Sequence, residues 1–134
     1  MKSKLVWVAL ILAIVASSRA MLAHHGTNIS YDEKKSIKFE GTVTEFRWAN
    51  PHAQIYFDVK DAKDSVAHWG GELNSPGVLS KAGWSRRTFK AGDMITITLH
   101  PSRVEGATVG LVDRSQPIFL NGKEVLGSGG NSID

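Results

Sequence analysis

The sequence predicts an all-β protein, a small OB-like barrel of five to six strands with one short helix between strands 3 and 4. Three observations favour this class. Segments in which apolar and polar residues alternate recur along the chain, the first of them changes its apolar face midway, and a short helix signal follows the third. A flattened β-sandwich is the alternative arrangement of the same strands.

The first strand is expected to begin at Ile37 and to bend. Its apolar and small residues occupy odd positions at first and even positions further on, namely Ile37, Phe39, Gly41 and Val43, then Phe46 and Trp48. A continuous strand that changes its buried face needs a bulge or a bend, here between Gly41 and Glu45. A first strand that bends to serve both sheets suits an OB-type barrel.

The second and third strands follow a turn at Asn50-Pro51, where the proline restricts the residue before it. The residues of the second strand expected to face inward are Ala53, Ile55, Phe57 and Val59. The third strand, residues 66–73, has an ambiguous phase. In the phase that we favour, the side chains of Ala67, Trp69 and Leu73 face inward. His68 and Glu72 then share the opposite face.

The rest of the chain contains one helix signal and further strands. Ser75 is a typical N-cap, Pro76 suits the first helical position, and Gly83 ends a helix of about two turns. Alternation predicts strands at residues 94–100 and 108–113. Asn121-Gly122 between short strand-like segments predicts a two-residue hairpin.

The first 23 residues have the features of a cleaved signal peptide. Lys2 and Lys4 precede an uncharged apolar segment that is too short to span a membrane, for which roughly 20 apolar residues are needed. Cleavage is expected after Ala20 or after Ala23. The predicted parts of the chain are a signal peptide at residues 1–23, an N-terminal arm at 24–36, the barrel at 37–126 and a flexible tail at 127–134. The mature protein is then periplasmic or secreted, with no membrane anchor.

The charge distribution does not indicate nucleic acid as a partner. Three of the 16 basic residues lie in the predicted signal peptide, and the remaining ones equal the 13 acidic residues in number. A formally neutral mature chain without a basic stripe is not expected to bind nucleic acid. The lack of cysteine excludes a disulfide framework, a thiol nucleophile and a zinc–thiolate site.

A series of short motifs occurs in a fixed order along the chain. They are His24-His25, Gly41-Thr42-Val43, Trp48-Ala49-Asn50-Pro51-His52, Ser75-Pro76, Gly83-Trp84, Ala91-Gly92-Asp93 and His100-Pro101. In this order and spacing, over residues 24–126, they resemble a family of small exported bacterial proteins of unknown function. The resemblance implies an OB-like barrel in the periplasm and no established activity.

All five histidines lie in the predicted mature chain, and two of them open it. Cleavage after Ala23 makes His24 the terminal residue, so its amine and its imidazole can chelate one metal ion together. An imidazole from His25 or His52 completes a nitrogen-rich site that suits Cu(II), and less selectively Ni(II) or Zn(II). The candidate ligands are therefore His24, His25 and His52, with copper as the favoured ion. An exposed chain end that binds metal adventitiously is the alternative.

A second set of residues indicates binding at the barrel rim without metal. Trp48 precedes the first turn, and Trp84 precedes the basic pair Arg86 and Arg87. Exposed aromatic side chains of OB-type barrels stack sugars and other planar ligands, and an arginine pair suits an acidic ligand. Core packing and a solvated surface are the ordinary alternatives.

The sequence marks no catalytic residues. None of the serines lies in a Gly-x-Ser-x-Gly elbow, and no pair of acids is set apart by its context, so an enzyme is less expected than a binding protein. The leading hypothesis is a non-enzymatic periplasmic binding module that takes a transition metal through its N-terminal histidines. The rival hypothesis is an accessory domain that binds a partner protein or a small ligand at the barrel rim.

Overall fold

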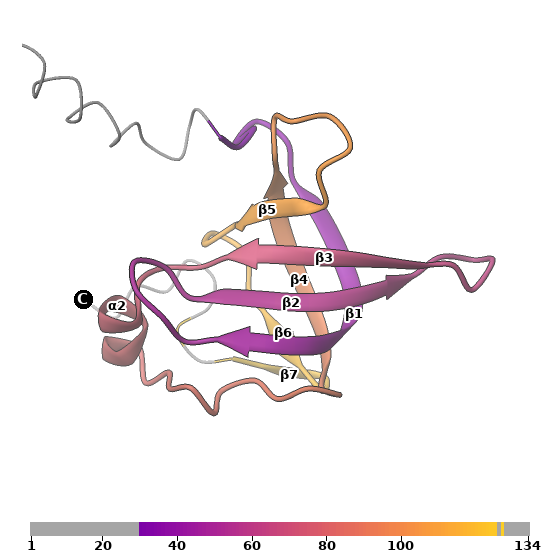
Figure 1. Ribbon diagram of the computed structural model, residues 1–134. Coiled ribbons are helices and arrows are strands. Elements are labelled where there is room, and N and C mark those ends of the chain that lie inside the picture. Colours follow the sequence, from indigo (N-terminus) through magenta and orange to yellow (C-terminus); the bar gives the residue numbers. More distant parts are fainter. Residues whose placement is uncertain (1–29, 126, 128–134) are drawn as a thin grey trace, which may run out of the picture.

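The strands form one seven-stranded sheet that closes on itself (Figure 1). The computed structural model describes residues 30–125 and 127. The elements within these residues are β1 (Ile37–Arg47), β2 (Gln54–Lys60), β3 (Val66–Glu72), α2 (Pro76–Lys81), β4 (Met94–Pro101), β5 (Val109–Val112), β6 (Phe119–Leu120) and β7 (Lys123–Glu124). β1 pairs with both β2 and β4, so β1, β2, β3, β5 and β4 make a closed barrel that β6 and β7 extend. The predicted OB-like barrel, with its helix between strands 3 and 4, is confirmed.

β1 serves both sides of the barrel by means of a bulge. Its first half pairs with β4 and its second half with β2, and the register with β2 shifts between Val43 and Glu45. The predicted change of buried face is therefore confirmed. Gly41 lies close to β2, where a Cβ atom would be 2.6 Å from the carbonyl oxygen of Asp58, so the close approach of the two strands requires glycine.

β2 and β3 form a hairpin whose far end extends beyond the rest of the barrel (Figure 1). Ile55 and Phe57 of β2 and Ala53, which directly precedes the strand, are fully buried, as alternation predicts. β3 pairs with β5 only from Gly70 to Glu72, so the earlier part of β3 lies outside the barrel wall. Ala67 is exposed there, and its predicted inward position is wrong. Trp69 and Leu73 do pack against the core.

The helix and the last hairpin lie where the turn residues predict. Ser75 caps α2, and its hydroxyl accepts a hydrogen bond from the amide of Val78 at 3.4 Å. Gly83 follows the helix with a φ of 86°. β6 and β7 are joined by Asn121 and Gly122, which take the positive φ angles that this type of two-residue hairpin needs.

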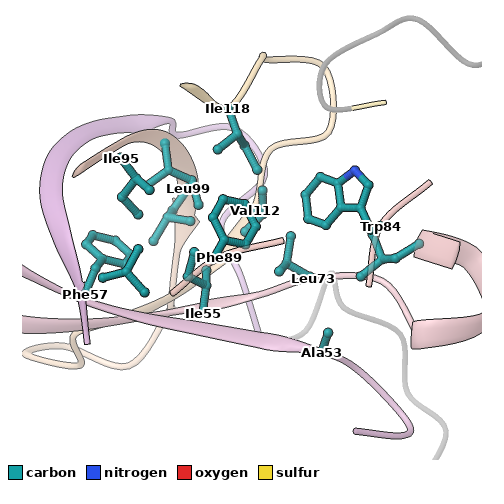
Figure 2. Close-up of a cluster of buried hydrophobic side chains, with 13 residues drawn as sticks. Ala53, Ile55, Phe57, Leu73, Trp84, Phe89, Ile95, Leu99, Val112 and Ile118 are labelled. Carbon is teal, nitrogen blue, oxygen red and sulfur yellow. The ribbon is translucent and has the colours of Figure 1, made fainter. Parts of the chain in front are cut away.

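The core fills the barrel and continues toward α2 (Figure 2). Large side chains from different strands meet inside it, among them Ile55 and Phe57 of β2 and Leu99 of β4. Near α2, the ring of Trp84 meets the ring of Phe89 edge to face, with centroids 5.4 Å apart. This end of the barrel is therefore closed by packed aromatic side chains.

The N-terminal arm is described from Ser30 onward and lies along the end of β4. Tyr31 forms an isolated antiparallel bridge with Ser102, and the amide of Asp32 donates to the carbonyl of Pro101 at 2.9 Å. The predicted signal peptide, the adjacent histidines and all of the predicted tail except Gly127 lie outside the described residues. Within residues 30–125 and 127, no helix is long and apolar enough to cross a membrane.

Candidate functional site

Two side chains from separate parts of the chain, those of Tyr31 and His52, meet at the carboxylate of Glu72 on the outer surface of the barrel. The Nδ1 atom of His52 lies 2.5 Å from Oε1 of Glu72, and the hydroxyl of Tyr31 donates to Oε2 of the same carboxylate at 2.6 Å. Both oxygens of Glu72 are therefore engaged. The side chain of His52 is 45% exposed and that of Glu72 is 20% exposed, so the imidazole is the member of the cluster that is open to solvent.

The strands fix the directions of His52 and Glu72. Ala53 is fully buried, and its backbone exchanges hydrogen bonds with Asn74 and Leu73 at 3.0 and 2.9 Å. Because successive side chains of an extended segment point to opposite faces, the burial of Ala53 turns His52 outward. The burial of Leu73 turns Glu72 outward for the same reason.

The arm brings Tyr31 to the same point. Besides its bridge to Ser102, the carbonyl of Tyr31 accepts a hydrogen bond from Nε of Arg103 at 3.0 Å, and the amide of Arg103 donates to the carbonyl of Ser30. These contacts hold the backbone of the arm against the loop after β4. The phenol of Tyr31 is thus placed from outside the sheet onto Glu72 of β3.

The electrostatics of the cluster assign its protons. Burial, followed by the hydrogen bond and the negative charge of Glu72, raises the pKa of Tyr31 well above its ordinary value, so the phenol stays protonated and donates. The carboxylate of Glu72 has no proton to give while it is ionised, so Nδ1 of His52 is the nitrogen that carries hydrogen. In the neutral imidazole, Nε2 then keeps its lone pair, which is the form that binds a metal ion.

The described residues do not contain a complete metal site of their own. Among residues 30–125 and 127, no group of three or more His, Cys, Asp or Glu side chains is arranged to hold a metal ion. Of the three predicted ligands, His52 is described and the other two, His24 and His25, lie outside the described residues. A metal ion on His52 would need further ligands from those residues.

The four residues predicted for the barrel rim lie in different surroundings. Trp84 is only 6% exposed and packs on Phe89 in the core, which leaves it little surface for a ligand. Trp48 is half-buried, with its ring 5.8 Å from that of Phe46. Arg86 and Arg87 are exposed in the loop after Trp84. The two tryptophans therefore pack on the hydrophobic core, whereas the two arginines remain at the surface.

A second histidine and carboxylate pair lies on the part of the hairpin that leaves the barrel. Nδ1 of His68 is 2.5 Å from Oδ1 of Asp58, and the side chain of His68 is 82% exposed. Its geometry matches that of His52 and Glu72, but neither residue contacts the arm in any interaction found within the described part of the chain. His68 and Glu72 share a face of β3, as predicted, and each has its own partner.

His100 ties the arm to the barrel. Its Nδ1 atom lies 2.8 Å from the carbonyl oxygen of Lys35, and its Nε2 atom lies 3.7 Å from the buried carboxylate of Asp113. Asp113 also accepts hydrogen bonds from the hydroxyls of Ser115 at 2.6 Å and Ser36 at 3.2 Å. Burial of Asp113 acts to raise the pKa of its carboxyl, but the bonds from Ser115, the charge of His100 and the bond from Ser36 outweigh burial and lower it.

The sequence predicted His52 as a candidate ligand but did not predict its contact with Glu72 or the contact of Tyr31 with the same carboxylate. Glu72 had a usable signal, because the alternation of β3 places it on the outer face and the hairpin pairs it with Gln54, two residues after His52. Tyr31 had none, since the arm is polar and without periodicity, and only the fold shows which strand it meets.

The protein is an OB-like barrel in which a histidine and a carboxylate meet a tyrosine of the N-terminal arm on the outer surface. The chain belongs to a family of unknown function, DUF6152, whose model matches residues 12–119. This confirms the resemblance to an unknown-function family. No curated protein and no solved structure matches the chain.

Proposed function

We propose that this protein is an exported binding module that holds one transition metal ion, with copper favoured, through Nε2 of His52 and the imidazoles of His24 and His25. The apolar segment near the N-terminus supports export. The observation that carries the proposal is the position of Glu72, which takes up Nδ1 of His52 and leaves Nε2 as the other ring nitrogen of a side chain that is 45% exposed. The protein is proposed to bind rather than to catalyse, because the cluster within the described residues consists of Tyr31, His52 and Glu72 and holds no serine, threonine or cysteine.

Metal-binding histidines commonly donate their second ring nitrogen to a carboxylate. The carboxylate fixes the tautomer and the ring orientation, and its charge makes the other nitrogen a better ligand. Glu72 meets this description, and Tyr31 in turn orients Glu72 through a 2.6 Å hydrogen bond. His52 is therefore prepared as a ligand before any metal arrives.

The arm supports the other half of the proposed site. Tyr31, which shares the carboxylate with His52, follows His25 by six residues. An extended chain spans roughly 3.3–3.6 Å per residue, so six residues reach at most about 22 Å. The anchoring of Tyr31 thus keeps His24 and His25 within reach of His52. If cleavage follows Ala23, the terminal amine of His24 adds a further nitrogen ligand.

Binding of a partner protein or a small ligand at the rim remains the alternative. The exposed arginines Arg86 and Arg87 favour it. The burial of Trp84 and the packing of Trp48 weigh against a stacking surface beside them. We therefore place the metal site first.

The test is Cu(II) titration of the protein beginning at His24, followed by calorimetry and by the nitrogen hyperfine pattern in electron paramagnetic resonance. We expect one equivalent of copper on the parent protein. His52→Ala should weaken binding by at least about tenfold, because it removes a ligand. His68→Ala is the matched control, since it removes an exposed histidine with the same carboxylate contact at 2.5 Å, and it should change nothing.

Equal copper affinity of the parent protein and His52→Ala would refute the site, as would the lack of a stoichiometric complex in the parent. Circular dichroism of each variant checks that the barrel is intact. Because His52 is partly exposed and outside the core, its removal should not unfold the protein.

A further inference from the structure

A small pocket lies on the outer surface of the barrel beside the proposed metal site at His52. Its volume is about 110 Å³, and it opens between β2, β3, β5 and the arm. The residues that line it are Tyr31, Gln54, Tyr56, Gly70, Gly71, Glu72, Val109 and Gly110. Only Glu72 and Tyr31 are shared with the cluster around His52.

The missing side chain of Gly70 creates the hollow. Gly70 is the register partner of Tyr56 on one side and of Val109 on the other. A Cβ atom at this position would lie 3.3 Å from the Tyr56 ring and 3.4 Å from a methyl group of Val109. A Cβ atom alone would therefore touch both neighbours, and a larger side chain would close the space between them and push them apart.

Hydrogen-bond donors and acceptors both surround the apolar walls of the pocket. The hydroxyl of Tyr56 donates to the amide oxygen of Gln54 at 2.7 Å, which leaves the amide nitrogen of Gln54 to donate to a ligand. Arg47 lies beside the pocket over the Tyr56 ring, with its guanidinium carbon 5.2 Å from the centroid. Its Nε atom pairs with Glu45 at 3.2 Å and its Nη1 atom donates to the Tyr56 hydroxyl at 3.4 Å, so its part is to hold the Tyr56 ring in place. The carboxylate of Glu72 is the acceptor on the other side.

We propose that this pocket binds a neutral sugar ring. Two phenol rings and Val109 offer apolar surface to the C–H groups of a sugar, and the surrounding donors and acceptors match its hydroxyl groups. Arg47 is paired with Glu45 at 3.2 Å, and Glu72 is engaged by His52 and Tyr31, so both charges already have partners within the protein. This favours a neutral ligand over an anion or a cation. Barrels of this type bind oligosaccharides on the face formed by strands 2 and 3, which is where the pocket lies.

The sugar site goes beyond the metal site and does not depend on it. The small volume holds part of one sugar ring, so we expect weak, millimolar binding to a short oligosaccharide that extends over the neighbouring surface. Maltotriose, cellotriose and tri-N-acetylchitotriose are suitable neutral probes.

The experiment is a titration of isotope-labelled, chelator-treated protein with each trisaccharide, followed by amide chemical shifts. For at least one probe, we expect saturable shifts confined to the residues around Tyr56, Gly70 and Val109. Gly70→Val fills the hollow and should abolish these shifts. Gly77→Ala is the control, because a Cβ atom there meets nothing closer than 4.0 Å and lies in α2, away from the pocket.

Tyr56→Ala provides a second variant should Gly70→Val not fold, and it should also abolish the shifts. His52→Ala should leave them unchanged, which separates this site from the proposed metal site. The proposal is overturned if none of the three probes shifts these amides, or if Gly70→Val responds as the parent does. It is also overturned if glucuronate binds more tightly than the neutral sugars, because Arg47 would then be the centre of an anion site.

Discussion

Glu72 accepts a hydrogen bond on one oxygen from Tyr31 and meets Nδ1 of His52 with the other. This arrangement gives the carboxylate two tasks. It holds the imidazole in one orientation, and in the proposed metal site its negative charge would stabilise the imidazole as Nε2 gives electron density to the ion. The proposal therefore assigns Glu72 a contribution to metal affinity, although Glu72 is not itself a proposed ligand.

Glu72→Gln should lower the affinity for Cu(II) by about tenfold or more, the range typical for loss of a carboxylate behind a metal-binding histidine. Glutamine keeps the shape of the side chain but removes its charge. The measurement is a competition titration with a chelator of known affinity.

Asp58→Asn makes the equivalent change behind His68, which has the same contact but no proposed part in the site. It should leave copper affinity unchanged. If the two variants lose affinity equally, the effect comes from the overall charge of the protein and not from the contact between Glu72 and His52.

Besides its backbone contacts with residues 101–103, the arm is held by Tyr31 on Glu72 and by Lys35 and Ser36 around His100 and Asp113. Asp113 is buried, and its hydrogen bonds lower the pKa of its carboxyl below the ordinary value of 3.8. A carboxyl whose folded-state pKa is lowered stabilises the fold above its unfolded-state pKa, and this stabilisation is lost as the pH falls through the folded-state value.

Asp113→Asn should therefore make the free energy of unfolding less dependent on pH under acidic conditions. The parent protein should lose free energy of unfolding as the pH is lowered from about 5 to about 3, and the variant, already less stable at neutral pH, should lose less over this interval. Urea unfolding at several pH values measures both curves.

Asp64→Asn, in the exposed turn after β2, is the control and should follow the parent. Parallel curves for the parent and Asp113→Asn would show that Asp113 does not carry this part of the pH dependence.

The strands were the most predictable elements because their signals are local. Alternation identified β2 and β4, and the change of phase in β1 located its bulge before Glu45. The beginning of β3 was harder to predict, because the burial of Ala67 depends on how far β5 extends beside β3. The arm could not be placed at all, since its contacts with β3 and β4 join residues that lie far apart in the sequence.

The whole molecule combines a closed barrel, whose interior is packed, with an arm that crosses its outer surface. The closed order of strands followed from the bent first strand and the helix after the third. Of the proposed metal site, the sequence supplied the three histidines by their number and position. It did not predict the hydrogen bond between Tyr31 and Glu72, because this contact depends on how the barrel closes and where the arm runs.

The central claim is that the mature chain begins with a histidine pair that binds copper together with His52. Native mass spectrometry of the protein recovered from the periplasm tests it most directly, because one spectrum reports the N-terminus and any bound mass. We expect a chain that begins at His24 and carries one copper ion. A chain that begins at Met21, or one that begins at His24 and carries no metal, would contradict the claim.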